Sequence, residues 1–103
     1  MFRLGMALAA ALTIGSAAGA QDLSIATGGT GGTYYPYGGG LAELIGKYVD
    51  GAQATAEVTG ASVENMALIA RQETDMALAL ADTVFGAYQG SIDPFTDRPV
   101  EAA

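Results

Sequence analysis

Short apolar runs alternate along this chain with longer segments whose apolar residues recur every three to four positions. The runs at 23–27 and 76–80 are typical of buried strands, and the second of them is apolar throughout, as a strand buried on both faces should be. The run 54–59 is a weaker strand candidate, because it contains alanines and a charged residue. The segment after each run has the period of a helix. Because a helix between two strands forms a right-handed crossover, this alternation predicts an α/β fold, a parallel sheet with helices on both faces.

Each predicted helix has an apolar side that we expect to face inward. These sides are formed by Leu41, Leu44, Ile45 and Tyr48 in the first helix, by Val63, Met66, Ala67 and Ala70 in the second, and by Val84, Phe85 and Tyr88 in the third. Ser62 and Asp82 are expected to cap the second and third helices, and Gly51 and Gly90 to follow the ends of the first and third. The segment 91–103 shows no periodicity and is predicted to be a loop.

Residues 1–20 differ in kind from the rest. Arg3 is followed by an apolar run, 4–14, and small residues close the segment at Ala20. This is the layout of a secretory signal peptide, and the run is shorter than the roughly 20 apolar residues of a membrane-spanning helix. We therefore expect cleavage after Ala20 and a periplasmic mature part, 21–103. An uncleaved anchor or a buried apolar helix is the alternative.

The composition of the expected mature part excludes several kinds of site. Three basic residues remain there against eleven acidic ones, so nucleic acid is not an expected partner, because a polyanion is bound by clustered Lys and Arg. The chain has no cysteine and no histidine, which removes thiolate and imidazole metal ligands and the commonest nucleophiles and bases. No serine stands next to a base, and no carboxylate pair is evident. We expect a binding protein and not an enzyme, with no cofactor and no metal.

The stretch 28–37, between the first strand and the first helix, is rich in glycine, threonine and tyrosine. Glycines leave backbone N–H groups accessible, and the helix behind them carries a partial positive charge at its N-terminus, so this turn predicts an anion site. A Walker loop would need a lysine, and Gly32 is followed by Thr33. A dinucleotide fingerprint would need glycine in place of Tyr34, although Asp50 lies at the distance of a ribose-binding acid. The other alternative is a tight glycine turn without a ligand.

Two further turns, 59–62 and 81–82, open helices at the same edge of the predicted sheet. Ligands of open α/β sheets bind outside the carboxyl ends of the strands, so we expect the three turns to share one site. Amide and hydroxyl donors without clustered cations, walled by tyrosines, suit a small carboxylate. Asn65 is interpreted either as an exposed helix residue or as a ligand contact, and Asp82 as a cap in preference to a ligand group.

Three motifs at defined spacing add a resemblance. They are ATGGTGGTYYP at 26–36, TGASVEN at 59–65 and DMALA at 75–79. Together they resemble the TAXI family of solute-binding proteins, which serve tripartite ATP-independent periplasmic (TRAP) transporters. The likeness extends over residues 23–90, and the paired motifs are more specific than a glycine motif alone.

The resemblance implies a type II periplasmic-binding-protein fold whose two lobes close around a glutamate-like amino acid or a dicarboxylate and deliver it to a membrane permease. Carried over by motif, the implied ligand contacts are Thr30, Gly31, Thr33 and Tyr34 in the first loop and Ala61, Ser62 and Asn65 in the second. In this chain Leu80 and Ala81 precede Asp82, where the family commonly has a polar residue, which weakens the third turn as a ligand contact. Family members are also about three times longer. We therefore expect a truncated first lobe, with a stand-alone small domain of structural or interaction role as the alternative.

Overall fold

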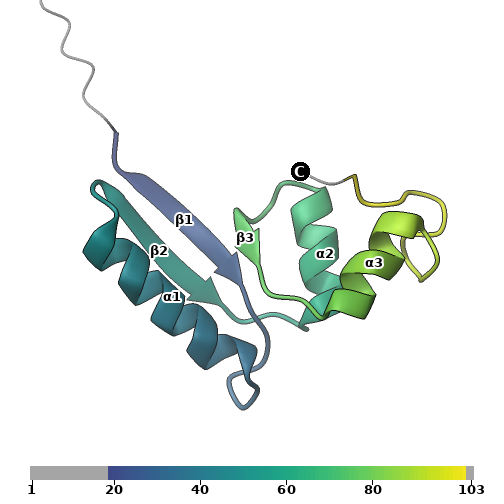
Figure 1. The fold of residues 1–103 in the computed structure, drawn as a ribbon, viewed down its shortest axis with the longest axis horizontal. Coiled ribbons are helices and arrows are strands. Elements are labelled where there is room, and N and C mark those ends of the chain that lie inside the picture. The colour runs from purple at the N-terminus through teal and green to yellow at the C-terminus, as the bar shows by residue number, and fades with distance from the viewer. Residues whose placement is uncertain (1–18, 102–103) are drawn as a thin grey trace, which may run out of the picture.

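The computed structural model describes residues 19–101, and within them six elements follow one another in the predicted order (Figure 1). They are β1 (Gln21–Ala26), α1 (Tyr34–Tyr48), β2 (Ala52–Glu57), α2 (Ser62–Ala70), β3 (Met76–Ala77) and α3 (Ala81–Gln89). The predicted signal segment falls almost wholly outside the described residues, so its cleavage stays a prediction. No helix between residues 19 and 101 has both the length and the apolar character needed to span a bilayer.

The three strands form one parallel sheet in the order β2-β1-β3. Gln21 pairs with Ala52 at the start of β1, and Ala26 pairs with Glu57 on one side and Ala77 on the other at its end. The two crossovers through α1 and α2 run in opposite directions across this sheet, so their common right-handedness places the two helices on opposite faces. The predicted α/β class with a parallel sheet is confirmed.

All three strands differ from their predicted limits, and β1 runs over Gln21–Ala26 and not over 23–27. β2 begins at Ala52 and not at residue 54, because Gln21 N–H already donates to Gly51 O at 2.8 Å and starts the ladder there. β3 pairs over two residues only, and the run 76–80 is at most half-buried, so the prediction of a strand buried on both faces is wrong. β3 lies at the edge of the described sheet, and the helix that packs against it is α2, whereas α1 packs on β1 and β2.

The predicted inward sides of the helices are correct only in part; Leu41 and Ile45 of α1 are half-buried as expected. Leu44 and Tyr48 of α1 are exposed, and the residue of α1 that is buried is Gly38. In α3 the three residues expected inward, Val84, Phe85 and Tyr88, are all exposed, whereas Gly86 and Ala87 are buried. In α2, Val63 and Ala70 are exposed, while Met66 is buried as predicted. Small residues face inward because neighbouring backbone and side chains approach these helices too closely for large ones; a Cβ on Gly38, for example, would collide with Thr27.

Buried side chains gather in two places. Ile25, Ala26 and Thr27 are buried at the carboxyl end of the central strand β1. A second cluster joins Met66 and Ala87 to Phe95 and Val100 of the last segment. That segment contains no helix or strand through residue 101, as predicted, and its Phe95 and Val100 pack against Met66 of α2 and Ala87 of α3. Both end signals follow their helices: Gly90 is the C-cap of α3, with a φ angle of 69°, whereas Gly51, with a φ angle of 75°, lies in the turn between Val49, the C-cap of α1, and β2.

Candidate functional site

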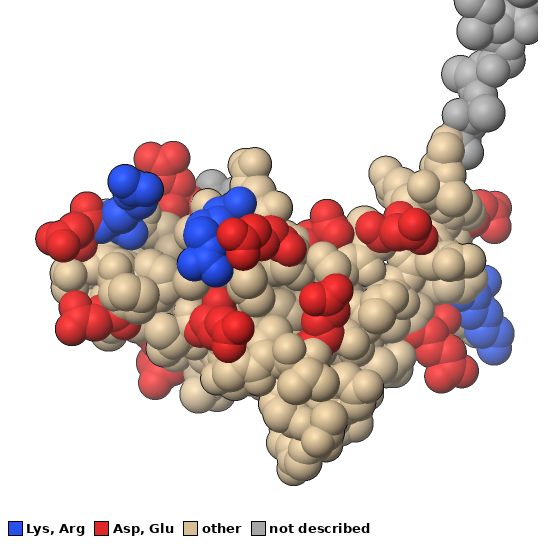
Figure 2. All heavy atoms as spheres, turned by 180° about the vertical axis from the view of Figure 1, so that it is seen from behind, with Lys and Arg blue, Asp and Glu red and all other residues tan. Residues whose placement is uncertain are grey.

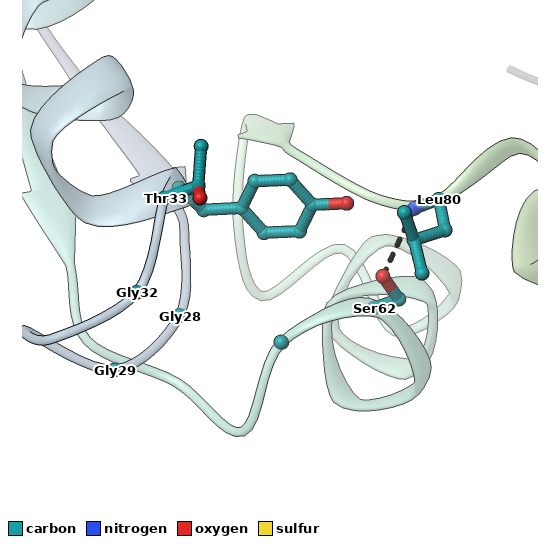
Figure 3. Close-up of a pocket in the computed structure, with 8 residues that line it drawn as sticks. Gly28, Gly29, Gly32, Thr33, Ser62 and Leu80 are labelled. Atoms are coloured by element: carbon teal, nitrogen blue, oxygen red, sulfur yellow. Dashed lines mark hydrogen bonds between the residues drawn. The ribbon is translucent and has the colours of Figure 1, made fainter.

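Three strand-to-helix turns meet at one edge of the sheet and enclose an open cleft of about 430 Å³ (Figure 3). Its lining comes from all three turns: Gly28, Gly29, Gly32, Thr33 and Tyr34 from the first, Ala61 and Ser62 from the second, and Leu80 from the third. The first two turns are in direct contact, because Thr59 N–H donates to Gly28 O at 3.3 Å. The prediction that segments 28–37 and 59–62 share one edge of the sheet is confirmed.

In the first turn, a tight backbone bend separates the predicted contacts into two groups. Gly32 N–H donates to Gly29 O at 3.0 Å, so Thr30 and Gly31 form the exposed tip of the bend and do not line the cleft. Thr33 and Tyr34 do line it, and Thr33 makes no side-chain cap bond to α1, so its hydroxyl is available to a ligand. The role of all four residues as ligand contacts stays a prediction.

In the second turn the predicted cap is wrong. Ala61 is the N-cap of α2, and Ser62 is the first helical residue. The Ser62 hydroxyl instead accepts a hydrogen bond from Leu80 N–H at 2.9 Å, which ties the second turn to the third (Figure 3). A hydroxyl that accepts in this way keeps its own proton to donate, so Ser62 presents one hydroxyl donor at the wall of the cleft.

Asn65 lies beneath the cleft and not in its wall. It is 0% exposed, so the interpretation of Asn65 as an exposed helix residue is wrong. Its amide nitrogen donates to Thr27 O at 2.6 Å and to Leu78 O at 2.7 Å, and its oxygen accepts from the Thr59 hydroxyl at 2.6 Å. These bonds join residues from three different strand ends through one side chain.

The third turn shows another corrected cap. Leu80 is the N-cap of α3, and Asp82 lies in the first turn of the helix, where its carboxylate accepts from Thr83 N–H at 2.7 Å. Leu80 is exposed at the cleft, although the apolar run 76–80 predicts a buried strand there and the family pattern weakens the third turn as a ligand contact. The glycines at 28, 29 and 32 were part of the predicted anion turn, although only the motif match identified individual contacts within it.

The cleft offers hydrogen-bond donors but no positive charge. None of its lining residues is charged. All three helices begin at this edge. Within residues 19–101, the backbone N–H groups of Tyr35, Ser62 and Val63 donate to no acceptor. The N-terminus of a helix attracts anions through such unpaired N–H groups and through its dipole. The arrangement therefore suits an anion held by dipoles.

Charged side chains lie on the outer surface, where acidic groups are spread over the face seen in Figure 2 and basic ones are few. Arg71 forms an exposed ion pair with Glu73, with 3.0 Å between Nε and Oε1. Glu64 and Asp82 occupy the first turns of α2 and α3, where a carboxylate is favourable to the helix but opposes a second anion nearby. Among the described residues, no group of three acidic side chains is arranged to hold a metal ion.

Residues 25–102 match the model of the NMT1-like family. The match begins within β1 and includes the three turns that form the cleft.

Proposed function

The chain belongs to the NMT1-like family, which is of the periplasmic-binding-protein kind, and we propose on this premise that it is the ligand-binding part of a receptor for a small organic acid. A solute-binding role in general follows from the family. The choice of a carboxylate rests on one observation, the cleft at which the N-termini of α1 and α2 and the Ser62 hydroxyl present donors without a cation. Phosphorylated ligands carry more charge and are usually met by Lys or Arg, which the lining lacks.

The size and lining of the cleft suit a compact ligand. Its volume of about 430 Å³ lies in the lower part of the range for small-molecule sites. Glycines at 28, 29 and 32 allow a carboxylate to approach backbone N–H groups, and Tyr34 supplies an aromatic wall. A glutamate-like amino acid or a dicarboxylate fits this description, with one carboxylate in the cleft and the rest of the molecule facing outward.

The remaining parts of the proposal rest on the motif resemblance. We propose that the receptor is of the TAXI kind, that it delivers its ligand to the permease of a tripartite ATP-independent periplasmic transporter, and that it acts in the periplasm after cleavage behind Ala20. A second lobe would then close over the cleft and supply the groups that identify the ligand. This closing half explains why the cleft formed by residues 28–80 is open on one side.

Nuclear magnetic resonance can test the carboxylate site directly. Titration of the ¹⁵N-labelled chain with succinate or L-glutamate is expected to shift the amide resonances of Gly32, Ser62 and Val63 in a saturable way. The dissociation constant is expected on the order of millimolar, because an open cleft buries only part of the ligand. Succinamide, which has the same shape but no charge, is the matched control.

Two outcomes would contradict this proposal. The carboxylate site is wrong if succinate leaves the cleft resonances unmoved, or if succinamide moves them equally. Calorimetry separately tests the proposal of a second lobe. Micromolar affinity of this chain alone would mean that no second lobe is needed to bind the ligand.

A second candidate function is a small domain that binds another protein. It is favoured by the exposed apolar residues of α3, which form a groove with Met66 and Val100. Gene context separates the two functions. A neighbouring gene for a membrane permease supports the receptor, and its absence together with failure of the succinate titration supports the protein-binding domain.

A further inference from the structure

We infer that Thr59 and Asn65 form a positioning pair that sets the geometry of the cleft without touching the ligand. The inference rests on the proposed function, because it concerns how the same site is held in shape. Both residues lie directly behind the lining, and Asn65 has no exposed surface through which a ligand could reach it. The motif resemblance implies a direct ligand contact at Asn65, and we infer a positioning role for this residue in its place.

The first argument is the reach of the Asn65 side chain. Its amide nitrogen faces only acceptors, the carbonyl oxygens of Thr27 at 2.6 Å, Leu78 at 2.7 Å and Ala26 at 3.4 Å. Its oxygen faces the Thr59 hydroxyl. The opposite orientation of the amide would set its oxygen against three carbonyl oxygens, so the hydrogen bonds fix the orientation. Asn65 thus connects the carboxyl ends of β1 and β3 with the turn that follows β2.

The second argument concerns the start of α2. The Thr59 hydroxyl accepts a hydrogen bond from Ala61 N–H at 3.1 Å, and its proton is directed to Asn65 Oδ1 at 2.6 Å or Thr27 O at 3.1 Å. Ala61 has a φ angle of 75° and a ψ angle of −146°, a conformation that residues other than glycine rarely adopt. The hydroxyl therefore holds a strained residue in place, and this residue sets the direction of the free Ser62 and Val63 N–H groups.

The third argument is electrostatic. Carbonyl oxygens at the carboxyl ends of parallel strands carry partial negative charge toward the edge where the anion is proposed to bind. From the interior of the protein, the Asn65 amide donates hydrogen bonds to the carbonyl oxygens of Thr27 and Leu78. The partial negative charge of these carbonyls is thereby reduced toward the cleft, where the N–H donors of the helices attract the anion. A side chain that could not donate would leave these acceptors unpaired and buried, which is costly.

The test uses Thr59→Val, which keeps the shape of the side chain and removes the hydroxyl. Thr74→Val is the matched control, because the Thr74 hydroxyl also lies between two strands, with its proton directed to Ser24 O at 3.2 Å or Met76 O at 3.0 Å, but away from the cleft. Thr59→Ser restores the hydroxyl and is the rescue variant. Asn65→Asp removes the donors altogether and is an additional variant, but failure of that variant to fold would not weaken the test, which depends on Thr59.

In the ligand-free chain, Thr59→Val is expected to shift the amide resonances of all three turns, at Gly28, Ala61 and Leu80. Thr74→Val is expected to leave them in place even if it lowers the melting temperature by a similar amount, and Thr59→Ser is expected to restore them. Succinate binding, measured well below the melting temperature, is expected to weaken about tenfold in Thr59→Val only, which is the factor for one buried hydrogen bond.

The positioning role is overturned if Thr59→Val leaves the Gly28 and Leu80 resonances unmoved, or if Thr59→Val and Thr74→Val weaken succinate binding equally. Failure of the proposed function looks different. In that case succinate fails to bind the unaltered chain, whereas the resonance shifts without ligand still decide whether Thr59 and Asn65 hold the three turns together.

Discussion

At the level of single residues, Ala61 combines two properties that rarely occur together. It lines the cleft, and it has a backbone conformation that suits glycine. Its methyl group packs close to Gly28, since a Cβ at residue 28 would lie 3.5 Å from Ala61 Cβ. Backbone strain at this position is thus stored where the first and second turns meet.

Replacing Ala61 by glycine is expected to raise the free energy of unfolding by about 1 kcal/mol. Relief of strain, about 1–3 kcal/mol, exceeds the extra entropy of the unfolded chain, about 0.4–1 kcal/mol. Ala70→Gly at the exposed end of α2 is the control and is expected to lower stability by about 0.5 kcal/mol. Urea denaturation measures both. A loss at position 61 as large as at position 70 would mean that Ala61 is not strained.

At the level of elements, α1 is positioned by a glycine. Gly38 is buried between the helix and the sheet, where it approaches Thr27 and Ala56, and Thr27 is itself fully buried. The neighbouring Gly39 has open space around the position of a Cβ. Two adjacent glycines of one helix therefore have different functions, because only the first allows close packing of α1 on the end of β1.

The substitution Gly38→Ala is expected to lower the free energy of unfolding by about 2 kcal/mol, because the added methyl group collides with a side chain that has no room to move. Gly39→Ala is the matched control and is expected to raise stability by about 0.5–1 kcal/mol through helix propensity. Thermal unfolding followed by circular dichroism compares them. Equal effects of the two changes would contradict the packing of α1 described above.

At the level of the whole molecule, large apolar side chains of the same type differ in burial. Phe95 is 4% exposed within the cluster around Met66, whereas Phe85 of α3 is 61% exposed. A second apolar surface runs along α1 beside Leu78, where Tyr37 and Leu44 are exposed. This surface includes Leu78 and the groove along α3 includes Ala79, the two residues that follow β3, whose outer edge has no neighbouring strand among the described residues.

One substitution at two positions tests this distribution. Phe85→Ala is expected to change the free energy of unfolding by less than about 1 kcal/mol, since the side chain is largely exposed. Phe95→Ala is expected to cost about 3–5 kcal/mol, a large part of the stability of a domain of this size. Far-ultraviolet circular dichroism during heating distinguishes them. A severe loss at Phe85 would show that α3 is packed more tightly than its exposure indicates.

The sequence by itself determined the order of elements, the parallel sheet and the edge at which the site forms. These features depend on local periods of apolar residues and on short-range signals such as Gly51 and Gly90, which each segment carries independently. The convergence of segments 28–37 and 59–62 followed from topology, because the carboxyl ends of parallel strands share one edge.

Only the tertiary structure decided which side of each helix is buried and what the polar side chains near the cleft bind. Asn65 reaches Leu78 and Ser62 reaches Leu80 across separations that no local pattern encodes. Phe85 and Phe95 are alike in character, yet one is exposed and the other buried. Burial of a side chain depends on which surfaces pack together, and these contacts join residues that are far apart in the sequence.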